Sequence, residues 1–482
     1  MAATSAPAGA PDTGAPLIGA AAGRAARARV RRGAHGEFAP ASDRPDPLDL
    51  LAAQARTRLQ ALVPLRHERM AVSAFAFFRG AAAVMAADLA ATPHTGLRVQ
   101  LCGDAHLANF GGFAAPDRRL VFDLNDFDET LPGPWEWDVK RLAASIAIAG
   151  RDRGFGSEQR AVATGAAVRE YREAIGRFAA ERHVEVWYAR LDVEALLDRW
   201  RTRIPAKELR SFERGLAKAR AKDSLRALDK LTDTTQGVPR IVADPPLIIP
   251  IEEVGELFGV PSQQIAVGVD ELLGEHRRTV VGATAHLLQR YRYVHAAHKV
   301  VGVGSVGTRA WIALLVGGGE HDPVFLQLKE AQASVLEPYA GASEFATHGE
   351  RVVRGQWLMQ AASDIFLGWV SGVGIDGQQR DFYVRQLWDW KKSVDLEKIS
   401  PHALAAYGQM CGWTLARAHA RSGDPEAIAA YLGGSDRFDQ ALTRFAEAYA
   451  DLNERDHAAL VAALKPGGRF HVASAAAEPA RG

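Results

Sequence analysis

The spacing of apolar residues divides the chain into helical stretches on either side of a β-rich one. From residue 47 onward apolar side chains recur at helical spacings, and this pattern predicts helices over 135–150 and through most of 156–232. Residues 299–331 instead alternate apolar with small or polar residues and are punctuated by glycine, which is typical of strands. Helical spacing returns after Pro401. The pattern predicts an α+β protein.

Changes in this pattern and in composition divide the chain into six segments. Residues 1–44 are rich in Ala, Gly, Pro and Arg, a composition that predicts a disordered tail. The rest divides into helices with two short strands over 45–150, a mainly helical part over 151–294, a β-rich part over 295–395, helices over 396–465 and a flexible tail over 466–482.

The composition narrows the classes of function. Fifty-eight Lys and Arg against 57 Asp and Glu leave a net charge of +1, which argues against a protein that coats nucleic acid or an anionic membrane. No apolar run approaches the ~18–20 residues that cross a bilayer. The two cysteines, Cys102 and Cys411, cannot form a disulfide framework. We expect a cytoplasmic protein with neither a nucleic-acid nor a membrane partner.

Oxygen-bearing side chains gather in "CGDAHLANFGG" and "LVFDLNDFDE". Asp104 and Asn109 are five residues apart, and Asp123 follows fourteen residues later, at the end of an apolar run. Phosphoryl transfer needs a carboxylate near the attacking hydroxyl, and an amide oxygen and a second carboxylate on Mg²⁺. Three carboxylates within six residues (Asp123, Asp126 and Asp128) repel one another unless a cation offsets them. We expect Mg²⁺ on Asn109, Asp123 and Asp126, the choice among the three carboxylates staying open; a plain Asp/Asn-rich turn is the alternative.

A glycine motif lies in the β-rich part. "GVGSVGTRAW" carries Gly302, Gly304, Ser305 and Gly307 between two strand-like runs. In a dinucleotide-binding fold a helix would begin at the last glycine, whereas here a strand follows. The motif therefore favours a β-hairpin over nucleotide phosphates, with an ordinary glycine-rich hairpin as the alternative.

A lysine and a glutamate follow the hairpin at regular intervals. Lys329 ends a predicted strand twenty-two residues after Gly307, and Glu350 lies twenty-one residues further, in a helix predicted over about 343–363. A glycine-rich hairpin, a strand lysine and a helix glutamate match the nucleotide-binding lobe of protein kinases. Lys329 would contact the α- and β-phosphates of ATP, and Glu350 would hold the lysine, with Glu337 and Glu344 as alternatives.

The first motif carries a resemblance. "CGDAHLANFG" resembles the catalytic loop of aminoglycoside phosphotransferases and other kinase-like enzymes, and "EWDVKRLAAS" resembles the helix that follows in them. The resemblance implies that Asp104 positions the acceptor hydroxyl and that Asp138 has a supporting structural role. His106 matches the phosphotransferase loop, but Cys102 stands where those enzymes usually carry histidine.

A second resemblance covers most of residues 45–460. "LVPLRHERMAVSAFAFFRGAA", "CGDAHLANFGGF", "FDLNDFDETLPGPWEWDVKRLAAS" and "VVGVGSVGTR" resemble a bacterial family known as a domain of unknown function. This resemblance identifies a family and implies no substrate.

The order of the motifs differs from that of ordinary kinases, in which the glycine-rich lobe comes first; here it follows the catalytic loop by about 190 residues. We expect a two-lobed, protein-kinase-like fold that is circularly permuted, with 45–150, 151–294 and 396–465 in the larger lobe and 295–395 as the nucleotide-binding lobe. The alternative is that the two motif sets are unrelated. Lys329 far from both Asp104 and Asp123 would exclude the permuted fold.

Together these features predict an ATP- and Mg²⁺-dependent phosphotransferase acting on a small-molecule hydroxyl acceptor. The alternatives are a nucleotide-binding pseudokinase or scaffold and an AMP transferase on the same fold. Arg66, Arg69 and Arg79 precede the catalytic loop and could bind substrate phosphate. We favour their pairing with the acidic cluster, because buried carboxylates need partners.

Overall fold

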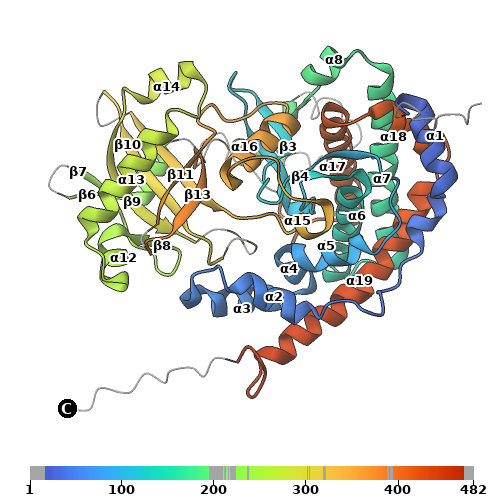
Figure 1. Ribbon diagram of the computed structural model, residues 1–482, viewed down its shortest axis with the longest axis horizontal. Coiled ribbons are helices and arrows are strands. Elements are labelled where there is room, and N and C mark those ends of the chain that lie inside the picture. The colour runs from blue at the N-terminus through green and yellow to red at the C-terminus, as the bar shows by residue number, and fades with distance from the viewer. Residues whose placement is uncertain are drawn as a thin grey trace, which may run out of the picture.

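The computed structural model describes residues 17–194, 210, 213–214, 217, 224–235, 238–300, 302, 304, 306–318, 322–374, 376–387, 390 and 394–471. Helices and strands are both present in quantity, which confirms the predicted α+β class. Figure 1 shows a six-stranded sheet with its helices at one end of the molecule and a group of long helices at the other. We call the first the β lobe (residues 224–387) and the second the helical lobe (residues 17–194 and 394–471).

The helical lobe is built around α6 (Trp135–Asp152), whose residues 135–150 are all buried. Its residues 142–150 are small or apolar, and the helix packs against α7 (Ser157–Ala180), α17 (Pro401–Ser422) and α19 (Arg437–Leu464). The backbones of α7 and α17 approach closely at Gly412, where a Cβ atom would lie 2.2 Å from the carbonyl oxygen of Ala167. A larger residue there would push the two helices apart.

Shorter elements complete the helical lobe. Two antiparallel strand sets carry the acidic motifs: β1 (Arg98–Leu101) pairs with β4 (Leu131–Pro134), and β3 (Leu120–Leu124) pairs with both β2 (Phe110–Ala114) and β5 (Leu191–Asp192). Further helices of this lobe are α2 (Pro47–Ala55), η2 (Gln60–Leu62), α3 (Val63–Ala71), α4 (Ala74–Gly80), α5 (Ala82–Ala90) and α8 (His183–Tyr188).

The disordered tail predicted over 1–44 is corrected where the structure describes it. Residues 19–29 form α1 (Gly19–Arg29), followed by η1 (Arg32–Gly36). Gly23 lets α1 lie against α18 (Pro425–Leu432), since a Cβ atom there would be 2.0 Å from the Ala427 oxygen. Arg27 donates from Nε to the carbonyl oxygen of Tyr431 at 2.8 Å, which satisfies a backbone group at the end of α18. Composition alone did not reveal this docking surface.

The other end of the chain also packs before it leaves the described residues. Arg469 pairs with Asp49 at the start of α2 (Nη2–Oδ1 2.6 Å), and the ring of Phe470 stacks on His67 of α3 with centroids 4.4 Å apart. The flexible tail predicted from residue 466 is therefore corrected for 466–471, and residues 472–482 lie outside the described part. The contacts bring the end of α19 beside the start of α2.

The β lobe contains one antiparallel sheet in the order β12-β13-β11-β10-β9-β8. Its central strands β10 and β11 are buried along their whole length, so both faces of the sheet are covered. The strands are β8 (Ile248–Pro250), β9 (Arg292–Lys299), β10 (Ala310–Val316), β11 (Pro323–Ala331), β12 (Gly368–Val373) and β13 (Gln379–Gln386).

The covering helices come from a segment that the sequence assigns to the larger lobe. On one face lie α12 (Ile251–Phe258) and α13 (Ser262–His276), with α14 (Gly282–Leu288) nearby. On the other lie α11 (Ser224–Leu231) and the hairpin of β6 (Thr232–Thr235) and β7 (Val238–Ile241). The predicted boundary at 294 is therefore too late, because the apolar stripes of these helices cover the sheet rather than α6.

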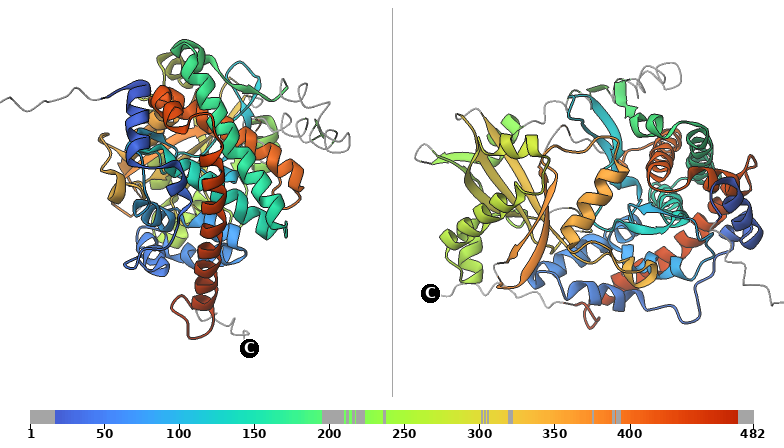
Figure 2. Two further views of the ribbon diagram at one scale, coloured as in Figure 1. Left: turned by 90° about the vertical axis from the view of Figure 1, so that its right-hand side faces the viewer. Right: turned by 45° about the horizontal axis from the view of Figure 1, so that its top comes forward.

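Two helices lie between the lobes. The short α15 (Glu337–Ala340) contacts β4 and α5 of the helical lobe, and α16 (His348–Met359) contacts β12 and β13 on one side and α17 on the other. The right-hand view of Figure 2 shows α16 between the sheet and the long helices. This helix therefore faces the space where the two lobes meet.

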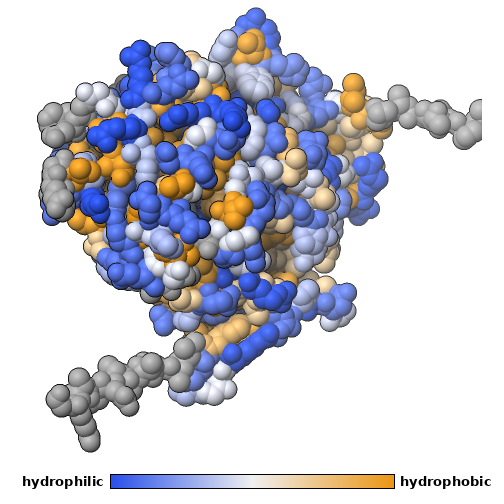
Figure 3. Space-filling model, turned by 60° about the vertical axis from the view of Figure 1, so that its left-hand side comes forward, coloured by the Kyte–Doolittle hydropathy of each residue, from blue (hydrophilic) through white to orange (hydrophobic). Residues whose placement is uncertain are grey.

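A helix that spans a membrane is long and apolar. In the part of the chain that the structure describes, no helix is long and apolar enough to span a membrane. Figure 3, which brings the β-lobe side forward, shows a mostly hydrophilic face with hydrophobic residues in small scattered groups.

Candidate functional site

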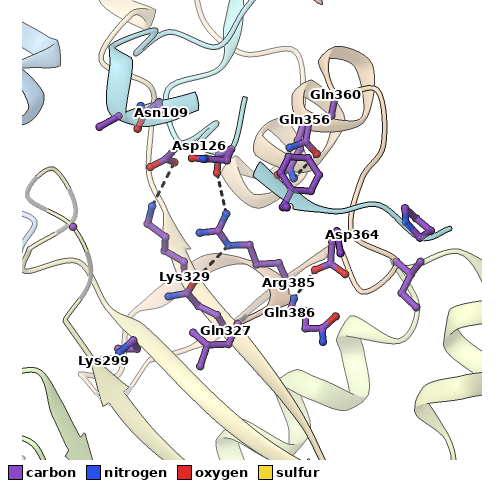
Figure 4. A pocket seen from close by; sticks show the side chains of 18 of the residues that line it. Asn109, Asp126, Lys299, Gln327, Lys329, Gln356, Gln360, Asp364, Arg385 and Gln386 are labelled. Atoms are coloured by element: carbon purple, nitrogen blue, oxygen red, sulfur yellow. Dashed lines mark hydrogen bonds and ion pairs between the residues drawn. The ribbon is translucent and has the colours of Figure 1, made fainter. Parts of the chain in front are cut away.

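A cleft of about 550 Å³ opens between the lobes. The helical lobe contributes Asn109, Asn125 and Asp126, and the β lobe contributes Lys329 and Arg385 (Figure 4). Charged and amide side chains from segments about 200 residues apart in sequence therefore face one another. Further polar lining residues are Arg79, Arg118, Lys299, Gln327, Gln356, Gln360, Asp364 and Gln386.

The carboxylate of Asp138, on α6, holds the loop between β1 and β2 in place. This carboxylate accepts hydrogen bonds from the backbone N–H groups of Cys102 (2.8 Å) and Gly103 (3.1 Å), and His419 lies 3.4 Å from the same carboxylate. Gly103 has φ +83°, and a Cβ atom there would lie 2.3 Å from the Glu129 oxygen, so this turn requires glycine. Asp138 thus has the structural contacts that the resemblance implies.

Asp104 lies at the tip of this loop. Arg141 donates from Nε to its Oδ1 at 2.5 Å, and His106 Nε2 is 3.6 Å from its Oδ2. Burial raises the pKa of Asp104 while Arg141 opposes the rise. The His106 side chain is buried among arginines, and burial holds its pKa well below the usual range, so His106 is neutral.

Asn109 ends the short helix η3 (Leu107–Asn109). Its Nδ2 donates to the backbone oxygen of Asp104 at 2.8 Å, which leaves Oδ1 as the amide atom available to a ligand. The backbone N–H of Asn125 donates to the Asn109 oxygen at 3.0 Å. This bond fixes the chain just before Asp126 beside Asn109, and both side chains line the cleft.

Asp123 and Asp126 have different environments. Asp123 lies on β3, all of whose residues are buried, and only 1% of its side chain is exposed. Its two carboxylate oxygens accept from Nη2 of Arg417 at 2.7 and 2.9 Å, and the Ala361 N–H donates to it at 2.8 Å. Asp126 lies past the end of β3, with 32% of its side chain exposed. The structure therefore brings Asn109 and Asp126 to the cleft and points Asp123 into the helical lobe.

Lys329 reaches these acids from β11. Its Nζ pairs with Asp128 and lies 3.6 Å from Oδ1 of Asp126. Burial by itself would lower the pKa of Lys329, but the carboxylates of Asp126 and Asp128 outweigh burial and raise it. Tyr383 of β13 donates to Asp128 at 2.8 Å. The lysine is thus charged and held by the acidic loop of the other lobe.

In the part of the chain that the structure describes, no ion pair joins Glu350 to Lys329. It is in the first turn of α16, where Arg354 Nε approaches its Oε1 at 3.3 Å. Thr347 caps the helix by accepting from the Glu350 N–H, and Glu350 is not among the residues that line the cleft. The alternative partner Glu337 accepts from the Ser334 N–H at 3.2 Å. The acids that pair with Lys329 come instead from the loop after β3, and they are Asp126 and Asp128.

The glycine-rich segment lies over the same region. Gly302 lines the cleft, and Gly302 and Gly304 line a smaller recess beside Asp104. Gly307 has φ +88°, and its carbonyl oxygen accepts from the Leu59 N–H at 2.8 Å. Ser305 lies outside the described residues. This hydrogen bond thus anchors the glycine-rich segment at Gly307 to the residues that precede α3.

Several site residues escaped the sequence analysis. Arg385 of β13 donates to the Asn125 carbonyl oxygen at 3.1 Å and to Gln327 Oε1 at 3.3 Å (Figure 4). Gln356 of α16 and Gln360, which directly follows that helix, line the cleft, and Nε2 of Gln356 donates to Oε1 of Gln360 at 2.9 Å. Their i, i+4 spacing on an otherwise apolar helix face is a signal that could have indicated them.

The donor set suits Mg²⁺ better than a transition metal. Among the described residues there is no group of three or more His, Cys, Asp or Glu that could hold a metal ion. Mg²⁺ is commonly bound through one or two carboxylates, substrate phosphates and waters. The carboxylate of Asp126 and the Oδ1 atom of Asn109 are hard oxygen donors of this kind, and both residues line the cleft.

Comparison with known proteins gives one match. The model of a family described as "Uncharacterized protein conserved in bacteria (DUF2252)" matches residues 58–463. No curated protein and no solved structure matches the chain. The matched span includes the acidic loops, the glycine-rich segment and Lys329.

Proposed function

This chain belongs to the bacterial DUF2252 family, whose description names no activity, and we propose that it is an ATP- and Mg²⁺-dependent phosphotransferase acting on a hydroxyl group of a small molecule. The observation that carries the proposal is the meeting of Lys329 with Asp126 and Asp128 across one cleft. A lysine for phosphates and an acidic loop for metal, on opposite lobes, form the arrangement that phosphoryl transfer uses.

The order of elements in the β lobe supports a kinase-like fold. The hairpin of β9 and β10 holds the glycines, β11 carries the lysine, α16 follows, and β12 and β13 complete the sheet. The same succession of glycine-rich hairpin, strand lysine and helix occurs in kinases. The contact of Arg469 with Asp49 supports permutation, because it places the two ends that an ordinary kinase order would join side by side.

Each side chain would then have a defined task. Lys329 would bind the α- and β-phosphates, with Gly302 and Gly304 above them. Asn109 Oδ1 and Asp126 would hold Mg²⁺, which supplies charge neutralisation when bound. Asp104, oriented by Arg141, would accept a hydrogen bond from the acceptor hydroxyl and take its proton. Catalysis in this scheme rests on positioning and on fixed charges.

A nucleotide-binding scaffold without transfer is the second candidate. Two observations favour it: Cys102 stands where kinase-like enzymes carry histidine, and Glu350 pairs with Arg354 rather than with Lys329. AMP transfer on the same fold would use the same metal ligands. Product analysis separates the three, since phosphoryl transfer releases ADP, AMP transfer releases pyrophosphate, and a scaffold releases neither.

The first test is ligand-dependent thermal stability. We expect ATP with Mg²⁺ to raise the Tm of the wild type, because a ligand that binds only the folded state at 100 times its Kd stabilises it by about 2.7 kcal/mol. Asp126→Asn should remove most of that rise. Asp117→Asn, an exposed aspartate paired with Arg190, is the matched control and should keep it. An equal Mg²⁺-dependent rise in Asp126→Asn, or none in the wild type, would contradict the proposal.

A further inference from the structure

A recess of about 80 Å³ lies beside Asp104, next to the nucleotide cleft. Arg79, Asn109, Asp126 and Gly302 line both spaces, so the two communicate. The recess alone is lined by Gln54, Arg58, Arg66, Gly80, Ala82, Asp104, His106, Asp128, Glu129 and Gly304. Its size suits a small chemical group rather than a nucleotide.

Three arginines enter this recess with unused donors. The Arg66 side chain, which is fully buried, donates from Nη2 to the Gly80 oxygen at 2.8 Å and to Gln54 Oε1 at 3.2 Å. Its Nε and Nη1 have no hydrogen-bond partner, and neither has the Nε of Arg58 or of Arg79. Within the residues that the structure describes, no ion pair joins a carboxylate to any of the three.

The carboxylates of the recess are already paired. Asp104 is bound by Arg141, and Asp126 and Asp128 are near Lys329. Glu129 accepts from the Val335 N–H at 2.8 Å, and burial raises its pKa to about 7. In the described residues no ion pair joins Arg66, Arg69 or Arg79 to the acidic cluster, so the pairing that the sequence favours is not found. The aspartates of the cluster pair with Arg141 and Lys329 instead.

An unpaired buried guanidinium is costly. Removing a charge from water without a counter-ion destabilises a protein by several kcal/mol, and burial accordingly lowers the pKa of Arg66 well below its usual value. An anion in the recess would supply the missing acceptor atoms and the missing charge. Guanidinium groups suit oxyanions in particular, because their N–H groups match two oxygens at once.

We propose that this recess binds an oxyanion of the acceptor, so that the substrate is a small hydroxyl compound that already carries a phosphate or a carboxylate. The inference rests on the proposed function, because it assigns the recess to the acceptor side of the transfer site. An acceptor anchored on Arg66 would be held next to Asp104, the group that takes its hydroxyl proton.

Inorganic phosphate and acetate are the probes. We expect millimolar phosphate or acetate, at constant ionic strength, to raise the Tm of the wild type, and the anion that acts more strongly identifies the group. Arg66→Gln should reduce the rise in Tm produced by phosphate or acetate at least tenfold. It should keep the rise in Tm produced by Mg²⁺ and ATP. Arg69→Gln, on the same helix but outside the recess, is the matched control and should behave as wild type. If Arg66→Gln does not fold, Arg58→Gln gives the same readout.

A competition arm separates the acceptor from the nucleotide. With a saturating non-hydrolysable ATP analogue and Mg²⁺, the phosphate or acetate effect should persist. Loss of the effect with this analogue but not with ADP would assign the recess to the γ-phosphate and overturn the inference. So would an equal anion effect in Arg66→Gln, or none in the wild type. An anion effect without any rise from Mg²⁺ and ATP would keep the anion site and contradict the proposed function instead.

Discussion

Glu129 illustrates how much a single side chain can depend on its surroundings. It follows the acidic loop, accepts from the Val335 N–H and lines the recess beside Asp104. Burial raises the pKa of its carboxyl from 4.5 to about 7, helped by the charges of Asp128 and Asp104 and opposed by that N–H bond and by Arg351. The protonated form is therefore favoured in the folded protein.

The raised pKa predicts a pH-dependent stability. Because the folded value lies above the unfolded one, the contribution of Glu129 is fully present below about pH 4.5 and is lost as the pH rises through about 7. Urea unfolding at pH 5 and pH 8 should show the wild type losing stability relative to Glu129→Gln at the higher pH. A constant difference between wild type and Glu129→Gln would refute the assignment.

At the scale of the element, the burial of β3 determines which aspartate is exposed to solvent. Every position of this strand is buried, so Asp123 needs Arg417 of α17 as a counter-ion, and only beyond Leu124 can an acid reach the cleft. Strand alternation and spacing predicted that the acids of this segment lie together, and the segment does border the cleft. They could not choose Asp126 over Asp123, because the arginine that occupies Asp123 lies 294 residues away in sequence.

This difference predicts opposite phenotypes for two neighbouring residues. Asp123→Ala should destabilise the protein by about 3–5 kcal/mol, because it leaves Arg417 buried without its partner. Asp126→Ala should change the free energy of unfolding by less than about 1 kcal/mol, since its side chain is partly exposed. Denaturant unfolding without nucleotide measures both. Equal losses of stability would mean that the two aspartates share one structural role.

At the scale of the whole molecule, the site is assembled from parts that lie far apart in the chain. The α+β class and four motif residues can be predicted from local sequence patterns. These residues are Asp104, Asn109, Asp126 and Lys329. The partner of Lys329, the arginines of the recess and the docking of α1 on α18 depend on contacts across hundreds of residues. Local spacing carries no information on such contacts, so it predicted Glu350 beside Lys329, whereas the structure pairs Glu350 with Arg354.

Hydrogen exchange should report this assembly. A non-hydrolysable ATP analogue with Mg²⁺ should slow amide exchange at 103–110 and 125–130 in the helical lobe and at 327–331 in the β lobe together. The contact between α1 and α18, at the far end of the helical lobe, should be unaffected and serves as the internal control. Protection confined to one lobe would contradict a nucleotide bound between them.

If the cleft binds nucleotide and Mg²⁺ as proposed, the pairing of Lys329 with Asp126 and Asp128 would make that binding an exchange of counter-ions. Phosphates that take the lysine leave two carboxylates without a cation, and a metal that takes Asp126 leaves the lysine with one fewer anion. Under the proposed function, each ligand would reduce the charge imbalance that the other creates, so their binding free energies would be coupled with positive cooperativity. Nucleotide and cation would then enter this cleft together rather than one after the other.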